Sequence, residues 1–297
     1  MKILHTADWH LGTFRSPVKD GVNLRTEDTK RCLDELIRVA GEERPDYSLV
    51  SGDIFHSGKT WSDRCCEEIV TATHYIKELA AVSKQENVMR GTPNHDGIGL
   101  FNVLAQTFEP FSNVNIVITP QVIPFEDADI ALIPGFDRGI FRANHPGISA
   151  DEENLVFTEE LSNIVTGLKA QCSPEKKSIL MAHYTVPGCN TESGQTMMLT
   201  QFEPIIPQEA LLAANYNLVA LGHIHRPQKI MHRDWYYSGA INAMNFNDEG
   251  QQRGFWIHNW HELGTWQSIF HETPIREFAT IELNDDDVTQ INMQAMD

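Results

Sequence analysis

The sequence predicts a mixed α/β fold with a layered or sandwiched core. Segments with strand-like and helix-like apolar periods alternate in the order β-α-β-α-β through the first part of the chain. The second part is richer in short alternating segments, which favour antiparallel strands. Several strands end directly before polar, metal-competent residues, and open α/β sheets bind ligands beyond the carboxyl ends of their strands.

The composition is that of a globular protein with one large domain or a domain plus an appendage. The chain has 297 residues, of which 41% are hydrophobic and 22% charged. Its net charge of −18 argues against a protein that coats nucleic acid, which usually has a basic surface. An enzyme that acts on nucleic acid is still compatible with this charge, because metal ions neutralise the carboxylates gathered around them.

Cysteine use and hydropathy predict a cytoplasmic protein that does not associate with membranes. The five cysteines are odd in number and show no CxxC spacing, which indicates free thiols in a reducing compartment. The sequence has no apolar run of bilayer length, and its first residues lack the apolar core of a signal peptide.

The N-terminal part is expected to alternate strands with helices. Cys32, Leu33 and Leu36 recur with a helical period, and Thr26 or Asp28 could cap that helix. Residues 13–24 read as a polar loop. The predicted strands are residues 2–7, 46–51 and 87–90, and the predicted helices are residues 26–43, 62–82 and 100–108.

The remainder is expected to be mostly strands. One further helix is predicted at residues 152–171, and residues 184–206 read as a long loop. The sequence shows no internal repeat and no linker before an acidic tail at residues 284–287. The predicted strands are residues 114–119, 130–134, 177–182, 218–221, 229–231, 235–238, 254–260, 265–270 and 275–283.

The segment from Leu221 to Pro227 contains two histidines that could bind metal. His223 and His225 follow an apolar strand and Gly222. In an extended chain, residues two apart point to the same face, and neutral imidazoles are good metal ligands. A polar strand end with two solvated histidines explains the pair equally well.

Four other strand ends resemble this one. Each is commonplace alone, as an ordinary turn or a satisfied histidine, but five such ends in one chain favour a common site. These strand ends contain more potential ligands than one tetrahedral zinc ion needs, and their number suits two ions that share a carboxylate. Manganese, iron, zinc and cobalt are the candidate metals. The residues are Asp8 and His10, Asp53, Asn94 with His95 and Asp96, His183, and His223 with His225.

These motifs resemble those of the calcineurin-like metallophosphoesterases. The flanking residues of the first, second and last motifs resemble more narrowly the SbcD-type nuclease subunits of double-strand-break repair, over roughly residues 1–280. The resemblance implies a four-layer α/β/β/α sandwich of two mixed sheets flanked by helices. It also implies a nuclease domain at residues 1–273, with residues 274–297 as the start of a truncated or vestigial capping domain.

The resemblance further implies a role for each motif residue. Asp8, His10 and His225 would bind the first metal ion, and Asn94, His183 and His223 the second. Asp53 would bridge both ions. Manganese is the expected metal, and a water-derived nucleophile activated by the two ions would attack phosphorus without a covalent enzyme intermediate.

Further residues are expected to support the reaction. The catalytic His95 would face the scissile phosphate, and His56 would guide the substrate, although a loop histidine without a role is an alternative. Asp96 and His5 are expected to lie behind the ligands or to be structural. The chain departs from the family pattern where Thr92 and Pro93 separate Gly91 from the Asn-His-Asp unit.

The leading functional hypothesis is a two-metal DNA nuclease that hydrolyses phosphodiester bonds. The resemblance implies an SbcC-like coiled-coil ATPase partner and a homodimer formed through helices near residues 62–82 and 98–108. A metallophosphatase or small-molecule phosphodiesterase of the same superfamily is the alternative, and a non-catalytic scaffold would require a lost ligand. Candidate DNA contacts are Arg15, Lys19, Lys59, Arg64, Arg90 and Arg226, although for any one of them a solvated surface charge is the favoured interpretation.

Overall fold

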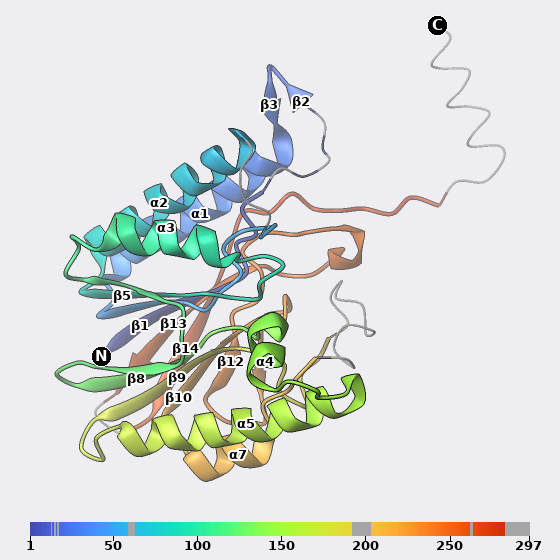
Figure 1. The fold of residues 1–297 in the computed structure, drawn as a ribbon. Coiled ribbons are helices and arrows are strands. Elements are labelled where there is room, and N and C mark those ends of the chain that lie inside the picture. The colour runs from blue at the N-terminus through green and yellow to red at the C-terminus, as the bar shows by residue number, and fades with distance from the viewer. Residues whose placement is uncertain are drawn as a thin grey trace, which may run out of the picture.

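Two six-stranded sheets lie face to face between two layers of helices in the computed structural model (Figure 1). The structure describes residues 1–12, 14, 16, 18–58, 63–191, 203–261 and 264–282, with the backbone alone at 63–66 and 150–151. No helix in these ranges is both long and apolar enough to cross a membrane.

The first sheet has the strand order β14-β13-β1-β4-β5-β6. Its four N-terminal strands run parallel because helical crossovers connect them, and the two C-terminal strands are antiparallel. The strands are β1 (Lys2–Thr6), β4 (Tyr47–Val50), β5 (Gln85–Met89), β6 (Val114–Val117), β13 (Gly254–Trp260) and β14 (Trp266–Glu272); the helices that cover them are α1 (Leu24–Glu43), α2 (Asp63–Val82) and α3 (Ile98–Phe108).

The second sheet has the order β11-β12-β10-β9-β8-β7, with antiparallel strands at both edges and parallel strands between them. Its strands are β7 (Gln121–Pro124), β8 (Ala128–Ile133), β9 (Lys177–His183), β10 (Leu218–Gly222), β11 (Gln228–Ile230) and β12 (Trp235–Tyr237). The helices on this side are α4 (Arg138–Asn144), α5 (Ala150–Gln171) and α7 (Gln208–Ala214), and the smaller elements are β2 (Val18–Lys19), β3 (Val22–Asn23) and η1 (Phe246–Asp248).

Three apolar cores hold the four layers together. One lies between the first sheet and its helices, as where Leu36 of α1 and Ile76 of α2 pack with Val88. A second lies between the other sheet and α5 and α7, and the third fills the space between the sheets. The predicted α/β/β/α sandwich is therefore confirmed.

Most predicted elements are present, with boundaries shifted by one or a few residues. The strand predicted at residues 275–283 is wrong, because residues 275–282 have no strand neighbour and lie along α1 through side-chain contacts such as the Arg276–Asp28 ion pair. The N-cap of α1 is Asn23, whose side chain accepts from two backbone N–H groups, and not Thr26 or Asp28. The elements β2, β3, β7, α4 and α7 were not predicted from the sequence.

Candidate metal centre

The carboxyl ends of the central strands in the two sheets meet at one place. Backbone hydrogen bonds link the segments after β1 and β4, where Asp8 N–H donates to the Gly52 carbonyl over 2.9 Å. Side chains connect the sheets, since Ser51 Oγ donates to the Ala220 carbonyl and His183 Nδ1 lies 2.7 Å from the Ser51 carbonyl oxygen. The meeting of these ends brings together residues distant in the sequence.

Several of these residues have left-handed backbones. The φ angles of Asp8, His10, Asp53 and His223 are 52°, 46°, 51° and 92°. Such a conformation is unfavourable for residues with a Cβ and is typically retained at functional sites. Gly52 also has a positive φ, and a Cβ there would lie 2.5 Å from His183 Nδ1, so the close approach of the two sheets requires glycine.

Asp8, His10 and His225 form the first group of potential ligands. Each offers a ligand atom within 4.8 Å of the others. The Nε2 atoms of His10 and His225 are 3.0 Å apart, a separation compatible with two ligands of one ion. The backbone N–H of His223 donates to Asp8, which fixes the carboxylate.

Asp53, His183 and His223 form the second group, again with ligand atoms within 4.8 Å of one another. His183 Nε2 lies 3.2 Å from Asp53 Oδ2, while its Nδ1 faces the Ser51 carbonyl. That carbonyl can only accept, so Nδ1 carries a proton, and Nε2 is the nitrogen that could bind a metal ion once it has lost its own proton. Asn94 lines the same cavity of about 280 Å³ as His183 and His223.

The charges in this centre are buried together. Burial raises the pKa of Asp8 to about 8, against the opposing effect of His183. Burial also opposes the charge on Asp53, yet His183 and His95 hold the pKa of Asp53 well below its usual range. Burial disfavours the charged form of His183, but Asp53 outweighs it and raises the pKa to about 10.

This donor set fits divalent metal ions. It combines carboxylate oxygens with imidazoles that burial keeps neutral, as in His10 and His225, whose pKa values are lowered well below the usual range and to about 3 respectively. Carboxylate and imidazole donors without thiolate suit manganese, iron, zinc or cobalt. A divalent cation would also compensate the charge of two carboxylates in a buried site.

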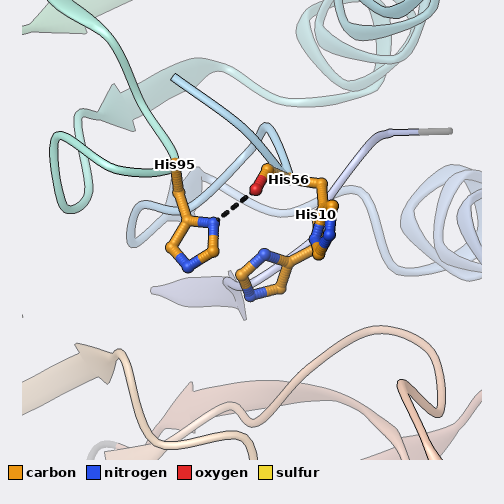
Figure 2. A group of neighbouring side chains, drawn as sticks. All are labelled: His10, His56 and His95. Carbon is orange, nitrogen blue, oxygen red and sulfur yellow. Dashed lines mark hydrogen bonds between the residues drawn. The ribbon is translucent and has the colours of Figure 1, made fainter. Parts of the chain in front are cut away.

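His95 and His56 lie beside the first ligand group. Figure 2 shows the rings of His10, His56 and His95 gathered together, with His95 Nδ1 2.7 Å from the His56 carbonyl oxygen. The His95 ring centroid is 4.6 Å from that of His10. The His56 ring packs on Phe14 with centroids 4.4 Å apart, and burial and His95 lower its pKa.

Among the described residues, Asp96 and His5 belong to neither ligand group, nor to the third set of close side chains that could hold an ion, which is His10, His56 and His95. Asp96 is fully buried and accepts from the backbone N–H groups of Ile54, Phe55 and Gly91, so it ties the loop after β4 to the loop after β5. His5 Nε2 contacts the Leu221 carbonyl in the strand that leads to His223.

The inserted Thr92 contacts the Asp53 carboxylate. Its backbone N–H donates to Asp53 Oδ1 over 2.8 Å, and its hydroxyl donates to the same oxygen over 3.1 Å. The two donors stabilise the ionised form of Asp53. From the sequence, Thr92 was recognisable only as a departure from the family pattern, because a threonine in a loop carries no signal of such a contact.

Glu203 is a second residue whose contact was not predicted from the sequence. Its Oε2 lies 2.7 Å from His223 Nε2. Glu203 also lines the cavity that contains Asn94 and His183. A single glutamate in a segment predicted as loop gave no indication of this pairing.

The structure describes the side chains of only some of the candidate DNA contacts. Arg15 and Lys59 lie outside the described residues, as does the side chain of Arg64. The expectation for Arg90 is wrong: its side chain is buried and donates to the Asp96 carbonyl and to Asp137, and so joins loops inside the protein. Lys19 is exposed on β2 and Arg226 is half-buried directly after His225.

Comparison with known proteins identifies the family. A family model described as calcineurin-like phosphoesterase matches residues 1–227, which include all of the predicted ligands. The chain is a calcineurin-like phosphoesterase. Membership makes it a metal-dependent phosphodiester hydrolase, in agreement with the two ligand groups.

Two curated relatives resemble this calcineurin-like phosphoesterase over nearly its whole length. The SbcD subunit of the SbcCD nuclease of Staphylococcus epidermidis is 23% identical over 98% of this chain and 74% of its own. The protein of the same name from Staphylococcus saprophyticus subsp. saprophyticus is 25% identical over 99% of this chain and 75% of its own.

Solved structures share the fold of this calcineurin-like phosphoesterase. GAP50, described as the anchor in the inner membrane complex of Plasmodium, aligns with a TM-score of 0.50 at 13% identity, over 99% of this chain and 94% of its own. TT1561 of Thermus thermophilus also aligns with a TM-score of 0.50, at 10% identity, over 91% of this chain and 98% of its own. At such identities the likeness concerns the fold alone.

Proposed function

We propose that the chain is a two-metal-dependent DNA nuclease of the SbcD kind, which hydrolyses phosphodiester bonds in double-strand break or hairpin processing. The observation that carries the proposal is a pair of ligand groups beside the His95–His56 contact. The near-full-length similarity to two proteins named as the SbcD subunit of an SbcCD nuclease supports DNA as the substrate.

The ligand assignment follows the two groups. Asp8, His10 and His225 would hold one ion, and His183 and His223 would hold the other together with Asn94, which lines the same cavity. Asp53, a member of the second group, would be shared by the two ions. The two ions, for which manganese is our first choice, would neutralise the phosphate and lower the pKa of a water molecule.

His95 acts on the substrate as a proton donor. Its Nδ1–H donates to the His56 carbonyl, which fixes the ring and leaves Nε2 as the position that gains or loses a proton. A protonated Nε2 stabilises negative charge on the phosphate or protonates the leaving oxygen. His56 guides the DNA, and Phe14 supports its ring.

The names of the relatives support an ATPase partner, and the family resemblance supports a homodimer. An SbcC-like ATPase subunit binds the chain, and two copies associate through α2 and α3, where Val70 and Ile98 are 68% and 45% exposed. A cytoplasmic location, and residues 274–297 as the start of a truncated or vestigial capping domain, belong to the same proposal. A phosphatase or small-molecule phosphodiesterase is the second candidate, because the net charge of −18 disfavours a polyanionic substrate.

A cleavage assay separates these functions. The full chain with manganese should degrade linear single-stranded or double-stranded DNA, EDTA should stop the reaction, and Asp53→Asn should abolish it. Cleavage of bis-p-nitrophenyl phosphate with both DNA forms intact would establish the second candidate. Fewer than two ions per chain after manganese loading would contradict the ligand assignment.

A further inference from the structure

Glu203 has no role in the ligand assignment, yet it contacts one of the proposed ligands. Its Oε2 lies 2.7 Å from His223 Nε2, a close contact between a carboxylate oxygen and an imidazole nitrogen. The Glu203 side chain is 32% exposed and that of His223 only 12%, so the contact is partly shielded from water.

The backbone around Glu203 is fixed relative to the metal centre. Two residues later, Ile205 forms a parallel β-bridge with Thr185, and Ile206 N–H donates to the Thr185 carbonyl over 3.0 Å. Thr185 follows the proposed ligand His183 by two residues. The segment that carries Glu203 is therefore attached to the strand end that carries His183.

Glu203 is not itself a member of the second ligand group. Among the described residues, that group contains Asp53, His183 and His223, whose ligand atoms all lie within 4.8 Å of one another. Glu203 contacts His223, so it would belong to this group if one of its oxygens also lay within 4.8 Å of the ligand atoms of Asp53 and His183. The carboxylate thus approaches His223 from outside the ligand group.

We infer that Glu203 is a positioning residue that orients His223 and holds its proton on Nε2, which leaves Nδ1 as the ring atom that binds the second metal ion. A carboxylate accepts only, so the short contact requires a proton on Nε2. Carboxylates that bind the non-ligating nitrogen of a histidine fix its tautomer and increase its basicity as a ligand. The inference rests on the proposed function, in which His223 binds metal.

Two substitutions test the role of the carboxylate. Glu203→Leu removes the acceptor at similar size, and Glu203→Gln keeps an acceptor without the charge. Titration of the metal-free full chain with manganese, followed by calorimetry, should show that Glu203→Leu weakens one of two sites by roughly 10- to 100-fold. Glu203→Gln should weaken that site less, and the other site should keep its affinity in both variants.

A second readout does not depend on metal or activity. Long-range ¹H–¹⁵N NMR spectra of metal-free protein labelled at histidine should show His223 protonated at Nε2 in the wild type and a mixture of tautomers in Glu203→Leu. Glu209→Leu is the matched control, because it removes the same charge at a position on α7 away from the metal centre. It should behave like the wild type in both measurements.

The outcomes distinguish this inference from the proposed function. If the wild type binds fewer than two manganese ions, the ligand assignment fails and the role of Glu203 fails with it. If the wild type binds two ions and Glu203→Leu binds both equally well with an unchanged His223 tautomer, only the role of Glu203 is overturned. Tighter binding in Glu203→Leu would overturn it as well, and Glu203→Gln decides if the leucine variant does not fold.

Discussion

At the scale of single residues, His95 is anchored at one ring nitrogen, and the proposed mechanism uses the other. The His56 carbonyl occupies Nδ1 at 2.7 Å, so the function of the ring depends on Nε2. His95→Ser removes that nitrogen but none of the six charged or imidazole ligands in the two groups. We expect phosphodiester cleavage to fall by roughly 10² to 10⁴-fold, the usual contribution of a positioned acid or base.

Metal binding separates this role from that of a ligand. Calorimetric titration with manganese should give the same stoichiometry and affinities for His95→Ser and the wild type. A variant that has lost an ion would mean that His95 is a ligand, and one that retains full turnover would mean that it has no part in the chemistry.

Gly91 controls the position of the Asp53 carboxylate, which we propose is shared by the two ions. A Cβ at this residue would lie 2.1 Å from Asp53 Oδ1 and 2.2 Å from the Asp53 backbone nitrogen, so Gly91→Ala must displace the Asp53 side chain together with the backbone of the loop after β4 or the loop after β5. We expect a loss of manganese affinity of roughly 10- to 100-fold, comparable with other changes around metal ligands. Equilibrium dialysis with manganese measures the effect.

The control for Gly91→Ala is another glycine in the same protein. Gly167 lies inside α5, where an added Cβ meets nothing within 4 Å. Gly167→Ala should keep the metal affinity and raise the free energy of unfolding by about 0.5–1 kcal/mol, because alanine is favoured over glycine in a helix interior. Normal affinity in Gly91→Ala would show that the loop can move without cost.

The proposed ligands were recognisable in the sequence because each directly follows an apolar strand or its turn. Asp8, Asp53 and His223 all have this position, and the carboxyl ends of parallel strands converge. Thr92 and Glu203 could not be predicted to contact Asp53 and His223. Their positions depend on how two loops fold back, which no period in the sequence encodes.

At the scale of elements, β1 and β13 bury a pair of stacked histidines between the sheets. The ring centroids of His5 and His258 are 5.7 Å apart, and both side chains are fully buried. Burial lowers the pKa of His5 to about 3 and that of His258 well below its usual range. Both are thus neutral in the folded protein, while in the unfolded chain they gain protons below about pH 6.5.

Acid should therefore destabilise this pair of strands. Stability is fully present above about pH 6.5 and is lost as the pH falls toward 3, by about 1.4 kcal/mol per pH unit for each histidine. In His258→Phe, the free energy of unfolding should fall less steeply with decreasing pH, by about 1.4 kcal/mol per pH unit. Urea unfolding in EDTA at several pH values measures the slope, and the exposed His261→Phe is the control. Equal slopes for His258→Phe and the wild type would contradict neutral burial.

The elements that were not predicted are short or lack a pattern. α4 and α7 have seven residues each, and β7 has four. Segments this short contain too few repeats of the apolar pattern to be distinguished from a loop. The segment at residues 275–282 alternates like a strand but lacks a neighbour to pair with. Whether a segment pairs with a neighbouring strand depends on the tertiary structure, and the local sequence pattern does not determine it.

At the scale of the whole molecule, residues 273–282 form a strap that runs from β14 across the N-terminal part of α1 (Figure 1). Thr273 donates to the Ile241 carbonyl, and Arg276 pairs with Asp28 at 2.7 Å. Phe278 packs on Phe246. The strap is thus held by a few side-chain contacts rather than by a sheet.

The strap also connects to the metal centre. The guanidinium of Arg25 lies 5.3 Å from the ring centroid of Phe278 and 5.1 Å from that of Phe14. Phe14 in turn packs on His56. Aromatic and cation–π contacts of this kind each contribute about 0.5–1.5 kcal/mol, so one of them is a substantial part of the attachment of the strap.

Phe278→Ala should release the strap without unfolding the sandwich. Trypsin cleaves after arginine, and it needs the chain around Arg276 to leave its place beside Asp28 and fit the protease as an extended segment. Because cleavage follows the population of the open form, its rate at Arg276 should rise roughly threefold to tenfold. Mass spectrometry of timed digests measures that rate, with Phe111→Ala as the control, since Phe111 packs on Phe108 away from the strap. If both variants are cut at the wild-type rate while the melting temperature of Phe278→Ala falls, Phe278 stabilises the sandwich as a whole and the strap has no separate opening.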